Sequence, residues 1–179
     1  MLLERIQQNA SLLAEHPAYR CGEDSLTYSQ LWNAASLLAA QLQDSAGAVA
    51  LIGTKQPMMA VGMLGSLLAG RPYLPLSSDQ PKERLQRILS QANPGTVIDC
   101  REIKAEQWLK REPATQNFLI PGDPSRDAYW LFTSGSSGSP KGVRISLAAL
   151  ENFVRWFCAL PAIRSRKKPG AALNQAQFS

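Results

Sequence analysis

Ten consecutive residues, Thr133 to Gly142, hold most of the side chains in this 179-residue chain that could do chemistry. The segment reads TSGSSGSPKG, with five hydroxyls, three glycines, one lysine and no acidic side chain. Glycines let backbone N–H groups converge on an anion without obstruction from a Cβ atom. The hydroxyls add hydrogen-bond donors and Lys141 adds a full positive charge. This combination suits a polyphosphate.

Two familiar nucleotide-binding loops do not fit this segment. A Walker A loop needs Gly-Lys-Ser/Thr, whereas Lys141 stands between Pro140 and Gly142. The G-x-G-x-x-G patterns fail as well, because Gly135 and Gly138 are three residues apart. Composition alone therefore leaves a second interpretation open, a Ser/Gly-rich hairpin connection without a ligand.

Other catalytic chemistries lack their residues. One histidine, His16, and three scattered cysteines at positions 21, 100 and 158 form no metal-ligand pattern and exclude most Ser-His-Asp and Cys-His mechanisms. An odd number of scattered cysteines favours reduced thiols in a reducing compartment. Cys158 has no base nearby in sequence, so we expect it to be buried and structural.

The elements that must position the Gly/Ser-rich segment alternate between short apolar strands and helices. This order predicts an α/β fold with a largely parallel sheet and flanking helices. Strands are predicted at 19–21, 26–28, 49–52, 73–74, 96–98, 129–132, 143–145 and 171–174, the first two as a hairpin. Helices are predicted at 2–15, 30–42, 58–69, 81–89, 104–109 and 147–157, with Ser29, Asp79 and Ser146 as N-caps. The helix at 58–69 is apolar nearly all round, as a helix covered on both sides would be.

Residues 129–143, YWLFTSGSSGSPKGV, closely resemble the phosphate-loop signature of AMP-forming adenylating enzymes, which include acyl-CoA synthetases, peptide-synthetase adenylation domains and luciferases. The one departure, Ser137 in place of threonine, keeps the hydroxyl. In the same order, residues 26–31 (LTYSQL) resemble the family's LTYxEL motif. Residues 68–76 (LAGRPYLPL) resemble its LKAGxAYVPLD motif, with Ser77 in place of the aspartate.

The last six residues, NQAQFS at 174–179, look like the NQAPFSFD stretch of the D-alanine–carrier protein ligase branch, with Gln177 in place of proline. The resemblance implies that a carboxylate, in this branch an amino acid such as D-alanine, is activated by ATP as an acyl-adenylate with release of pyrophosphate. The thiol of a carrier protein's phosphopantetheine would then accept the acyl group.

The resemblance also implies the site residues. The hydroxyls and glycines would contact the phosphates of ATP, Lys141 would neutralise their charge, and Mg²⁺ is expected with ATP. The residues assigned to the nucleotide in this way are Thr133, Ser134, Gly135, Ser136, Ser137, Gly138, Lys141 and Gly142. The family's catalytic lysine belongs to a C-terminal subdomain, so no catalytic residue is expected in this chain.

Members of the family run to several hundred residues. Residues 1–179 are therefore expected to be a partial N-terminal adenylation domain, with the phosphate loop at 133–142 and without the C-terminal subdomain. Such a chain is expected to be inactive alone, and its unfinished sheet edge could invite association. A truncated gene product and a deliberate shortening both fit. The alternative function is a non-catalytic nucleotide- or partner-binding module that keeps the phosphate loop.

The net charge of +5 is placed unevenly, since residues 141–179 hold seven basic side chains and one acidic side chain. A nucleic-acid binder is a third hypothesis, but the basic run at 164–168 has no interleaved aromatics, so a solvated loop is favoured and no nucleic-acid partner is expected. The longest uncharged stretch, 56–70, has 15 residues, whereas a membrane span needs about 20. With no secretory signal at the N-terminus, a cytoplasmic location is expected.

Overall fold

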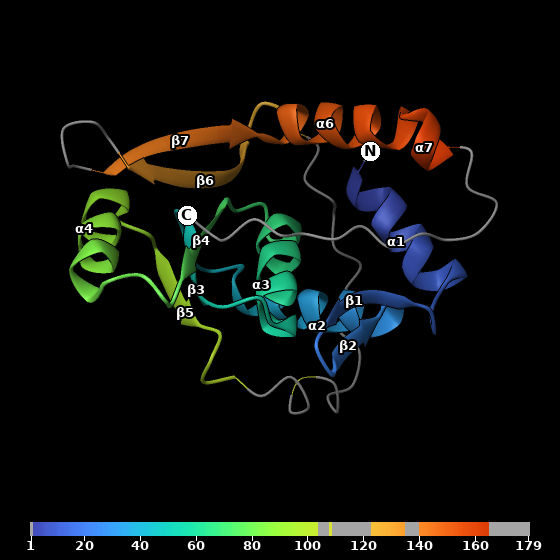
Figure 1. The fold of residues 1–179 in the computed structure, drawn as a ribbon, viewed down its shortest axis with the longest axis horizontal. Coiled ribbons are helices and arrows are strands. Elements are labelled where there is room, and N and C mark those ends of the chain that lie inside the picture. The colour runs from blue at the N-terminus through green and yellow to red at the C-terminus, as the bar shows by residue number, and fades with distance from the viewer. Residues whose placement is uncertain (1, 104–107, 109–122, 135–139, 165–179) are drawn as a thin grey trace.

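A five-stranded sheet in the order β5-β3-β4-β6-β7 lies at the centre of the part of the chain that the structure describes (Figure 1). The computed structural model describes residues 2–103, 108, 123–134 and 140–164. The strands are β3 (Val49–Gly53), β4 (Tyr73–Ser77), β5 (Thr96–Asp99), β6 (Asp127–Ser134) and β7 (Pro140–Ser146). Strands β5, β3, β4 and β6 run parallel, and β7 is antiparallel to β6. The predicted largely parallel α/β sheet is confirmed.

Two crossover helices lie on opposite faces of this sheet. α3 (Pro57–Leu68) connects β3 to its neighbour β4. α4 (Lys82–Ala92) connects β4 to β5, and β5 pairs with the opposite edge of β3. The two connections cross the sheet in opposite directions, so right-handed crossovers put their helices on opposite faces. Ten of the twelve residues of α3 are buried, whereas α4 buries only Ile88. The predicted two-sided cover of the apolar helix is thus confirmed for α3.

The N-terminal region adds helices outside α3. α1 (Leu2–Leu12) leads to the antiparallel hairpin β1 (Pro17–Cys21) and β2 (Asp24–Thr27), and α2 (Tyr28–Gln41) follows directly. The predicted hairpin is confirmed, while α1 ends before the predicted Glu15. α2 packs closely on α3 at Gly65, where an added Cβ atom would lie 3.0 Å from the carbonyl oxygen of Ala35.

Two predicted helix starts are wrong. The N-cap of α2 is Thr27 rather than Ser29: Thr27 Oγ1 accepts a hydrogen bond from the Gln30 backbone N–H (3.2 Å), and Gln30 Oε1 accepts one from the Thr27 N–H (2.9 Å). This reciprocal pair is a capping box. The N-cap of α4 is Pro81 rather than Asp79, and no side chain caps this helix.

The predicted end of the fourth strand is also wrong, because β4 continues through Pro75 to Ser77 instead of ending at Leu74. β4 keeps its parallel register with β3 across this position, where Leu51 is opposite Pro75. On its other side, β4 pairs with β6 at Tyr73, which is opposite Tyr129. Proline has no N–H to donate, and a strand tolerates it where pairing on one side is incomplete.

A buried arginine, Arg71, joins the segment before β3 to the start of β5. Arg71, only 6% exposed, donates to the carbonyl oxygens of Ala46 (2.6 Å) and Gly47 (2.8 Å), in the segment that precedes β3. It also donates to Thr96 Oγ1 (3.3 Å) at the start of β5. Burial lowers the pKa of its guanidinium from the usual value. All these acceptors belong to the fold itself, so the role of Arg71 is to hold these segments together.

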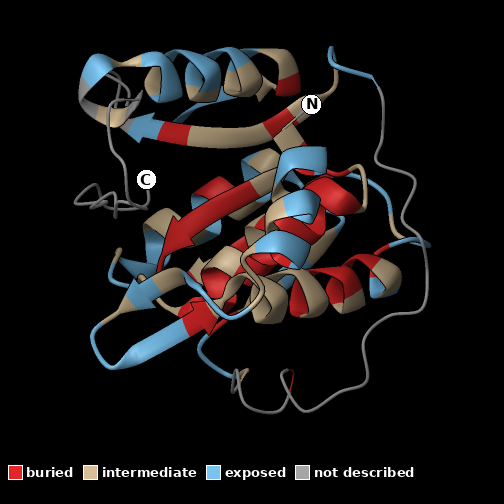
Figure 2. Ribbon diagram, turned by 90° about the vertical axis from the view of Figure 1, so that its right-hand side faces the viewer, coloured by how far each residue is buried: buried red, intermediate tan, exposed pale blue. Residues whose placement is uncertain are grey.

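The β6–β7 hairpin forms one edge of the sheet, and α6 (Leu147–Ala159) continues along the same side of the molecule, followed by α7 (Pro161–Arg164) (Figure 1). Ser146 is the N-cap of α6, as predicted, and its Oγ accepts from the Ala149 N–H (3.2 Å). Only Leu147 is buried in this helix (Figure 2). The expectation that Cys158 is buried is therefore wrong, since it lies on the exposed side of α6.

Several predictions fall outside the described residues. These are the strand at 171–174, the basic run beyond residue 164 and the helix at 104–109, of which only Trp108 is described. Trp108 is buried against the cluster that includes Leu51 and Met59. Within the described ranges, no helix combines the length and the apolarity that a bilayer crossing requires.

Candidate functional site

The Gly/Ser-rich segment connects the two strands of the antiparallel β6–β7 hairpin. The strands pair from Asp127 opposite Ser146 to Ser134 opposite Pro140, so both ends of the segment are fixed by backbone hydrogen bonds. Four of the predicted phosphate-binding residues, Gly135, Ser136, Ser137 and Gly138, lie outside the described residues. The hairpin brings the other four, Thr133, Ser134, Lys141 and Gly142, together at its end.

The register of the hairpin assigns these residues to two faces. Phe132 is opposite Gly142, is 3% exposed and packs in the same cluster as Ile88 of α4, so this face points toward α4. A side chain at Gly142 would crowd this ring, because a Cβ atom would lie 3.0 Å from Phe132. Successive side chains of a strand alternate, so Thr133 and Lys141, which are opposite one another, lie on the other face. Both are exposed.

The hairpin end lies at the carboxyl edge of the parallel strands. In an open α/β sheet, ligands bind in the crevice outside this edge. Thr133 offers a hydroxyl and Lys141 an ammonium on one open face, and together they can hold oxygens of an anion. This geometry fits phosphate groups of a nucleotide better than it fits a metal ion. Among the described residues, no group of three or more His, Cys, Asp or Glu side chains could hold a metal.

Cross-strand contacts stiffen the base of the hairpin. Asp127 Oδ2 accepts from Trp130 Nε1 (2.7 Å) and from Arg144 Nε, and the Arg144 guanidinium lies 5.5 Å from the centre of the Trp130 ring. Sequence reasoning missed this group. The signal that could have found it is an acidic residue just before one predicted strand and a basic residue on the next.

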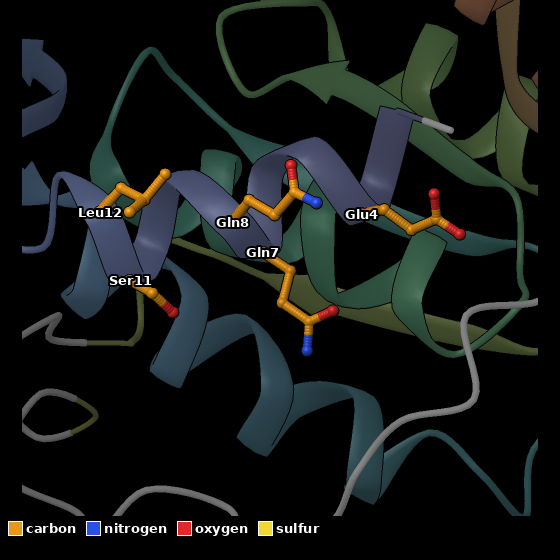
Figure 3. A pocket seen from close by; sticks show the side chains of 5 residues that line it. All are labelled: Glu4, Gln7, Gln8, Ser11 and Leu12. Carbon is orange, nitrogen blue, oxygen red and sulfur yellow. The ribbon is translucent and has the colours of Figure 1, made fainter.

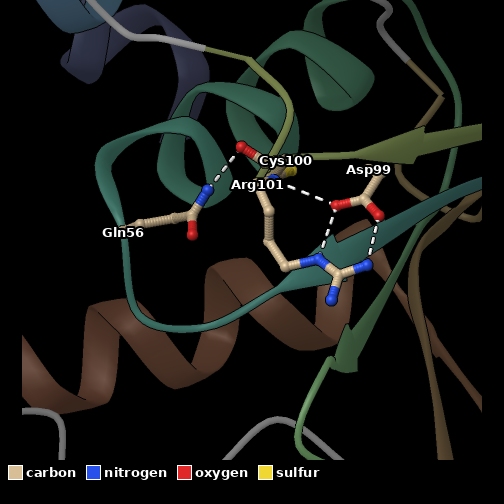
Figure 4. Close-up of polar contacts among 4 residues, drawn as sticks. All are labelled: Gln56, Asp99, Cys100 and Arg101. Carbon is tan, nitrogen blue, oxygen red and sulfur yellow. Dashed lines mark hydrogen bonds and ion pairs between the residues drawn. The ribbon is translucent and has the colours of Figure 1, made fainter.

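Polar groups at the end of β5 are satisfied by one another. The Arg101 guanidinium donates to both carboxylate oxygens of Asp99. The side-chain amide of Gln56, the N-cap of α3, donates to the carbonyl oxygen of Cys100 (Figure 4). The hydrogen bond from Arg101 lowers the pKa of the Asp99 carboxyl. This cluster connects β5 to the α3 start, and we assign no ligand to it.

A shallow groove on α1, of about 490 Å³, is lined by Glu4, Gln7, Gln8, Ser11 and Leu12 (Figure 3). All five side chains come from one helix and carry no positive charge, so they offer no charge complement to a phosphate.

The Tyr73 ring stacks on Tyr129, with ring centroids 5.4 Å apart, and burial raises the pKa of Tyr73 well above the usual value. Tyr73 thus packs against the core.

A mainly parallel α/β sheet flanked by helices is the architecture of the N-terminal subdomain of adenylate-forming enzymes. The chain belongs to the AMP-binding enzyme family, whose profile matches residues 6–170.

Curated relatives agree with this family. The chain is 32% identical over 187 residues to the D-alanine–D-alanyl carrier protein ligase of Staphylococcus aureus (strain JH9), an alignment that covers 99% of this chain and 38% of the relative. The ligase from strain Newman gives the same values. The chain therefore spans 38% of the length of these relatives.

Solved structures share the fold at lower identity. The Klebsiella oxytoca NpsA N-terminal subdomain, in complex with 3-hydroxyanthranilyl-AMSN, has a TM-score of 0.67 at 23% identity and covers 82% of this chain and 40% of that chain. The AMPPNP-bound form of the nonribosomal peptide synthetase FmoA3 has a TM-score of 0.74 at 23% identity, with coverage of 90% and 19%. VinN in complex with 3-methylaspartate has a TM-score of 0.76 at 15% identity, with coverage of 90% and 52%.

Proposed function

We propose that this chain is the N-terminal part of an ATP-dependent adenylating ligase that activates D-alanine for transfer to a carrier-protein thiol. The observation that carries the proposal is the pairing of Thr133 with Lys141 on the open face of the hairpin, at the ends of the Gly/Ser-rich segment. The 32% identity to D-alanine–D-alanyl carrier protein ligases over 99% of the chain supports the choice of substrate and acceptor.

The proposed reaction has two steps. A carboxylate oxygen of D-alanine forms a bond to the α-phosphorus of ATP, and the bond from that phosphorus to the bridging oxygen breaks. The pyrophosphate leaves with the electron pair. In the second step the carrier thiol loses its proton, its sulfur bonds to the acyl carbon, and AMP leaves with the electrons of the broken acyl–oxygen bond.

The residues of this chain act in the first step. Negative charge grows on the departing pyrophosphate, so fixed donors around it stabilise the transition state electrostatically. The Thr133 hydroxyl donates a hydrogen bond to a phosphate oxygen, and the Lys141 ammonium offsets its charge. The segment between them resembles the family's phosphate loop, so we expect it to contribute further hydrogen-bond donors. Mg²⁺, bound through the phosphates, would neutralise further charge.

The experiment that tests this role is calorimetry with ATP and Mg²⁺ on the 179-residue chain and on Lys141→Ala. We expect wild type to bind and Lys141→Ala to bind at least tenfold more weakly, because a charge-assisted contact to phosphate is lost. Arg20→Ala, which removes one exposed positive charge from β1, is the control and should bind as wild type does. Equal binding by Lys141→Ala and wild type would contradict the assignment of Lys141.

We further propose that residues 1–179, a partial adenylation domain in our interpretation, bind nucleotide without completing adenylation. The coverage of 38% of the relatives supports this. The alternative function, a non-catalytic nucleotide-binding module, rests on the same Thr133–Lys141 pair. ATP–pyrophosphate exchange with D-alanine, L-alanine or no amino acid tests whether this chain completes adenylation. Exchange catalysed by this chain would refute the proposed inactivity and exclude the non-catalytic alternative.

A further inference from the structure

The helix α6 carries apolar side chains on two of its sides. Leu147, Leu150 and Val154 are spaced three and four positions apart and share the side that faces the core. Leu147 is buried there, and Leu150 packs against the same cluster. A surface helix normally has polar residues on the rest of its circumference. α6 has a second apolar side instead, and burial against the core does not use it.

This second side, the α6 seam, consists of Ala149, Phe153, Trp156 and Leu160, spaced by four, three and four positions. Such spacing aligns side chains along one line of a helix, and it is the spacing found in helices that pair with one another. Phe153 and Trp156 are each 58% exposed. Ala149 is exposed as well, and Leu160 is half-buried (Figure 2). The seam is therefore accessible to a partner.

The aromatic rings of the seam contact one another. The centroid of the Phe153 ring lies 5.8 Å from that of Trp156 and 6.4 Å from that of Phe157. These contacts restrict the side chains before any partner binds, which lowers the entropy that binding costs. Aromatic residues are also enriched at protein interfaces. The rings thus form a continuous, preorganised apolar patch, which scattered exposed side chains do not.

The charged side chains of α6 lie away from the seam. Glu151 and Arg155 stand two positions before and after Phe153, so they are about 160° round the helix from it. Glu151 Oε1 accepts a hydrogen bond from the Leu2 N–H (2.7 Å), which directs it toward α1. Depletion of charge is typical of the centre of a protein interface. The seam therefore suits another apolar protein surface.

The seam is complementary to itself. When two copies pair antiparallel about an axis midway between Phe153 and Trp156, each Phe153 faces the partner's Trp156, and each Ala149 faces the partner's Leu160. Such an isologous pairing uses the same patch on both copies and closes at two. Antiparallel pairing also opposes the two helix dipoles. It keeps apart the two hairpins, each with its positively charged Lys141, that precede α6.

We propose that the α6 seam is a homodimer interface, in which two copies of this chain pair through antiparallel α6 helices. An aromatic side chain buries about 150–250 Å², so the four rings of Phe153 and Trp156, each 58% exposed, supply roughly 350–600 Å². Flanking residues bring the total near the ~1,000 Å² that a specific interface needs. We therefore expect a weak dimer, with a dissociation constant on the order of 10–100 μM. The interface does not include the hairpin end, so the inference is independent of the proposed function.

Sedimentation equilibrium of the 179-residue chain, from about 1 to 300 μM, measures the dimer fraction. We expect the dissociation constant of Phe153→Ala/Trp156→Ala to rise at least tenfold, because buried aromatics at the centre of an interface carry most of its binding energy. Alanine keeps the helix, and circular dichroism spectra with thermal melts establish that the variant is folded.

Two control variants remove exposed apolar side chains elsewhere. Leu12→Ala acts on α1, where Leu12 is 79% exposed, and Val97→Lys acts on β5, where Val97 is 51% exposed. Both should leave the dissociation constant within twofold of wild type. β5 is an edge strand, and a lysine on an edge strand hinders pairing between sheets. Val97→Lys therefore also tests association through the sheet edge.

Disulfide cross-linking tests the antiparallel geometry and does not depend on the double variant. It uses a Cys158→Ala background, which removes the exposed native thiol. Chains carrying Ala149→Cys and chains carrying Leu160→Cys, mixed and oxidised, should form covalent dimers. Neither variant alone should do so, because the two copies of position 149 lie at opposite ends of the interface, on the order of 16 Å apart.

Each outcome decides the inference. A concentration-dependent dimer that is lost in the double variant, with cross-links only in the mixture, supports it. A wild-type chain that stays monomeric at every concentration overturns it and leaves the seam to another occupant, such as the remaining length of the relatives. Dimers that persist in the folded double variant also overturn it, and their loss in Val97→Lys then identifies the sheet edge. Cross-linking by Ala149→Cys alone overturns the antiparallel pairing.

Discussion

At the scale of single residues, the three cysteines differ in how far packing shields them. Cys100 is buried at the end of β5, Cys21 is half-buried and Cys158 is exposed on α6. Burial, with a contribution from the nearby Asp99 charge, raises the pKa of the Cys100 thiol to about 12. The thiolate is the reactive form, so both access and ionisation protect Cys100.

We predict that an aromatic disulfide reagent at pH 8 labels Cys158 rapidly and leaves Cys100 unlabelled in the folded chain. A pKa of about 12 leaves roughly one thiol in ten thousand ionised at pH 8. Mass spectrometry of peptides after timed labelling measures this, with Cys158→Ala as the control that removes the fast reaction. Denaturant should make Cys100 reactive. Labelling of native Cys100 as fast as Cys158 would contradict the burial.

Sequence reasoning assigned the phosphate role of Thr133 and Lys141 from their neighbours in the chain, and that role stays a prediction. Thr133 and Lys141 bracket a Gly/Ser-rich segment in sequence, and the register of the hairpin places them opposite one another. It failed for Cys158, which lies among apolar residues of an amphipathic helix. Whether such a residue is covered depends on what packs against the helix, and sequence spacing does not contain that information.

At the scale of elements, the errors concentrate at helix starts. Thr27 and Ser29 are both good N-cap residues two positions apart, and the sequence predicts the second. The structure selects Thr27 because β2 ends there, so its backbone is already extended (φ −76°, ψ 167°), as an N-cap requires. For α4, Pro81 takes the N-cap position in an extended conformation and Asp79 lies outside the helix.

The capping box of α2 supports a direct comparison. We expect Thr27→Ala to lower the free energy of unfolding by about 1 kcal/mol, because the Gln30 backbone N–H loses the Thr27 hydroxyl as its acceptor. Ser29→Ala should change it by less than about 0.5 kcal/mol. Urea unfolding followed by circular dichroism measures both, with Thr27→Ser as the conservative control. A larger loss in Ser29→Ala than in Thr27→Ala would restore the original prediction.

At the scale of the whole molecule, the close approach of α2 to α3 decides what local propensity cannot. Alanine is a better helix former than glycine by about 1 kcal/mol, so propensity alone predicts that Gly65→Ala stabilises α3. The structure predicts the opposite, since a Cβ atom at Gly65 would lie 3.0 Å from the Ala35 carbonyl oxygen and 3.1 Å from Leu38 Cβ.

We expect Gly65→Ala to lower the free energy of unfolding by about 1–3 kcal/mol, as overpacking of a well-filled core does. Gly62→Ala is a matched comparison in the same helix. The three atoms nearest to its added Cβ all belong to the side chain of Leu51, which can shift more easily than backbone, so the loss should be smaller. Thermal and urea unfolding of both variants check this. Stabilisation by Gly65→Ala would show that the helices do not approach as closely as described.

The sequence by itself determined the order of the elements, the α/β class and the position of the Gly/Ser-rich segment between two strands. These depend on periodicity and turn chemistry within a few neighbouring residues. Tertiary structure alone decided that Arg71 clamps the segment before β3 to β5, and that Phe132 turns one face of the hairpin toward α4. It also decided that Arg84 and Arg87 border Pro140. Such contacts join residues far apart in the chain, and they exist only once the helices have packed on the sheet.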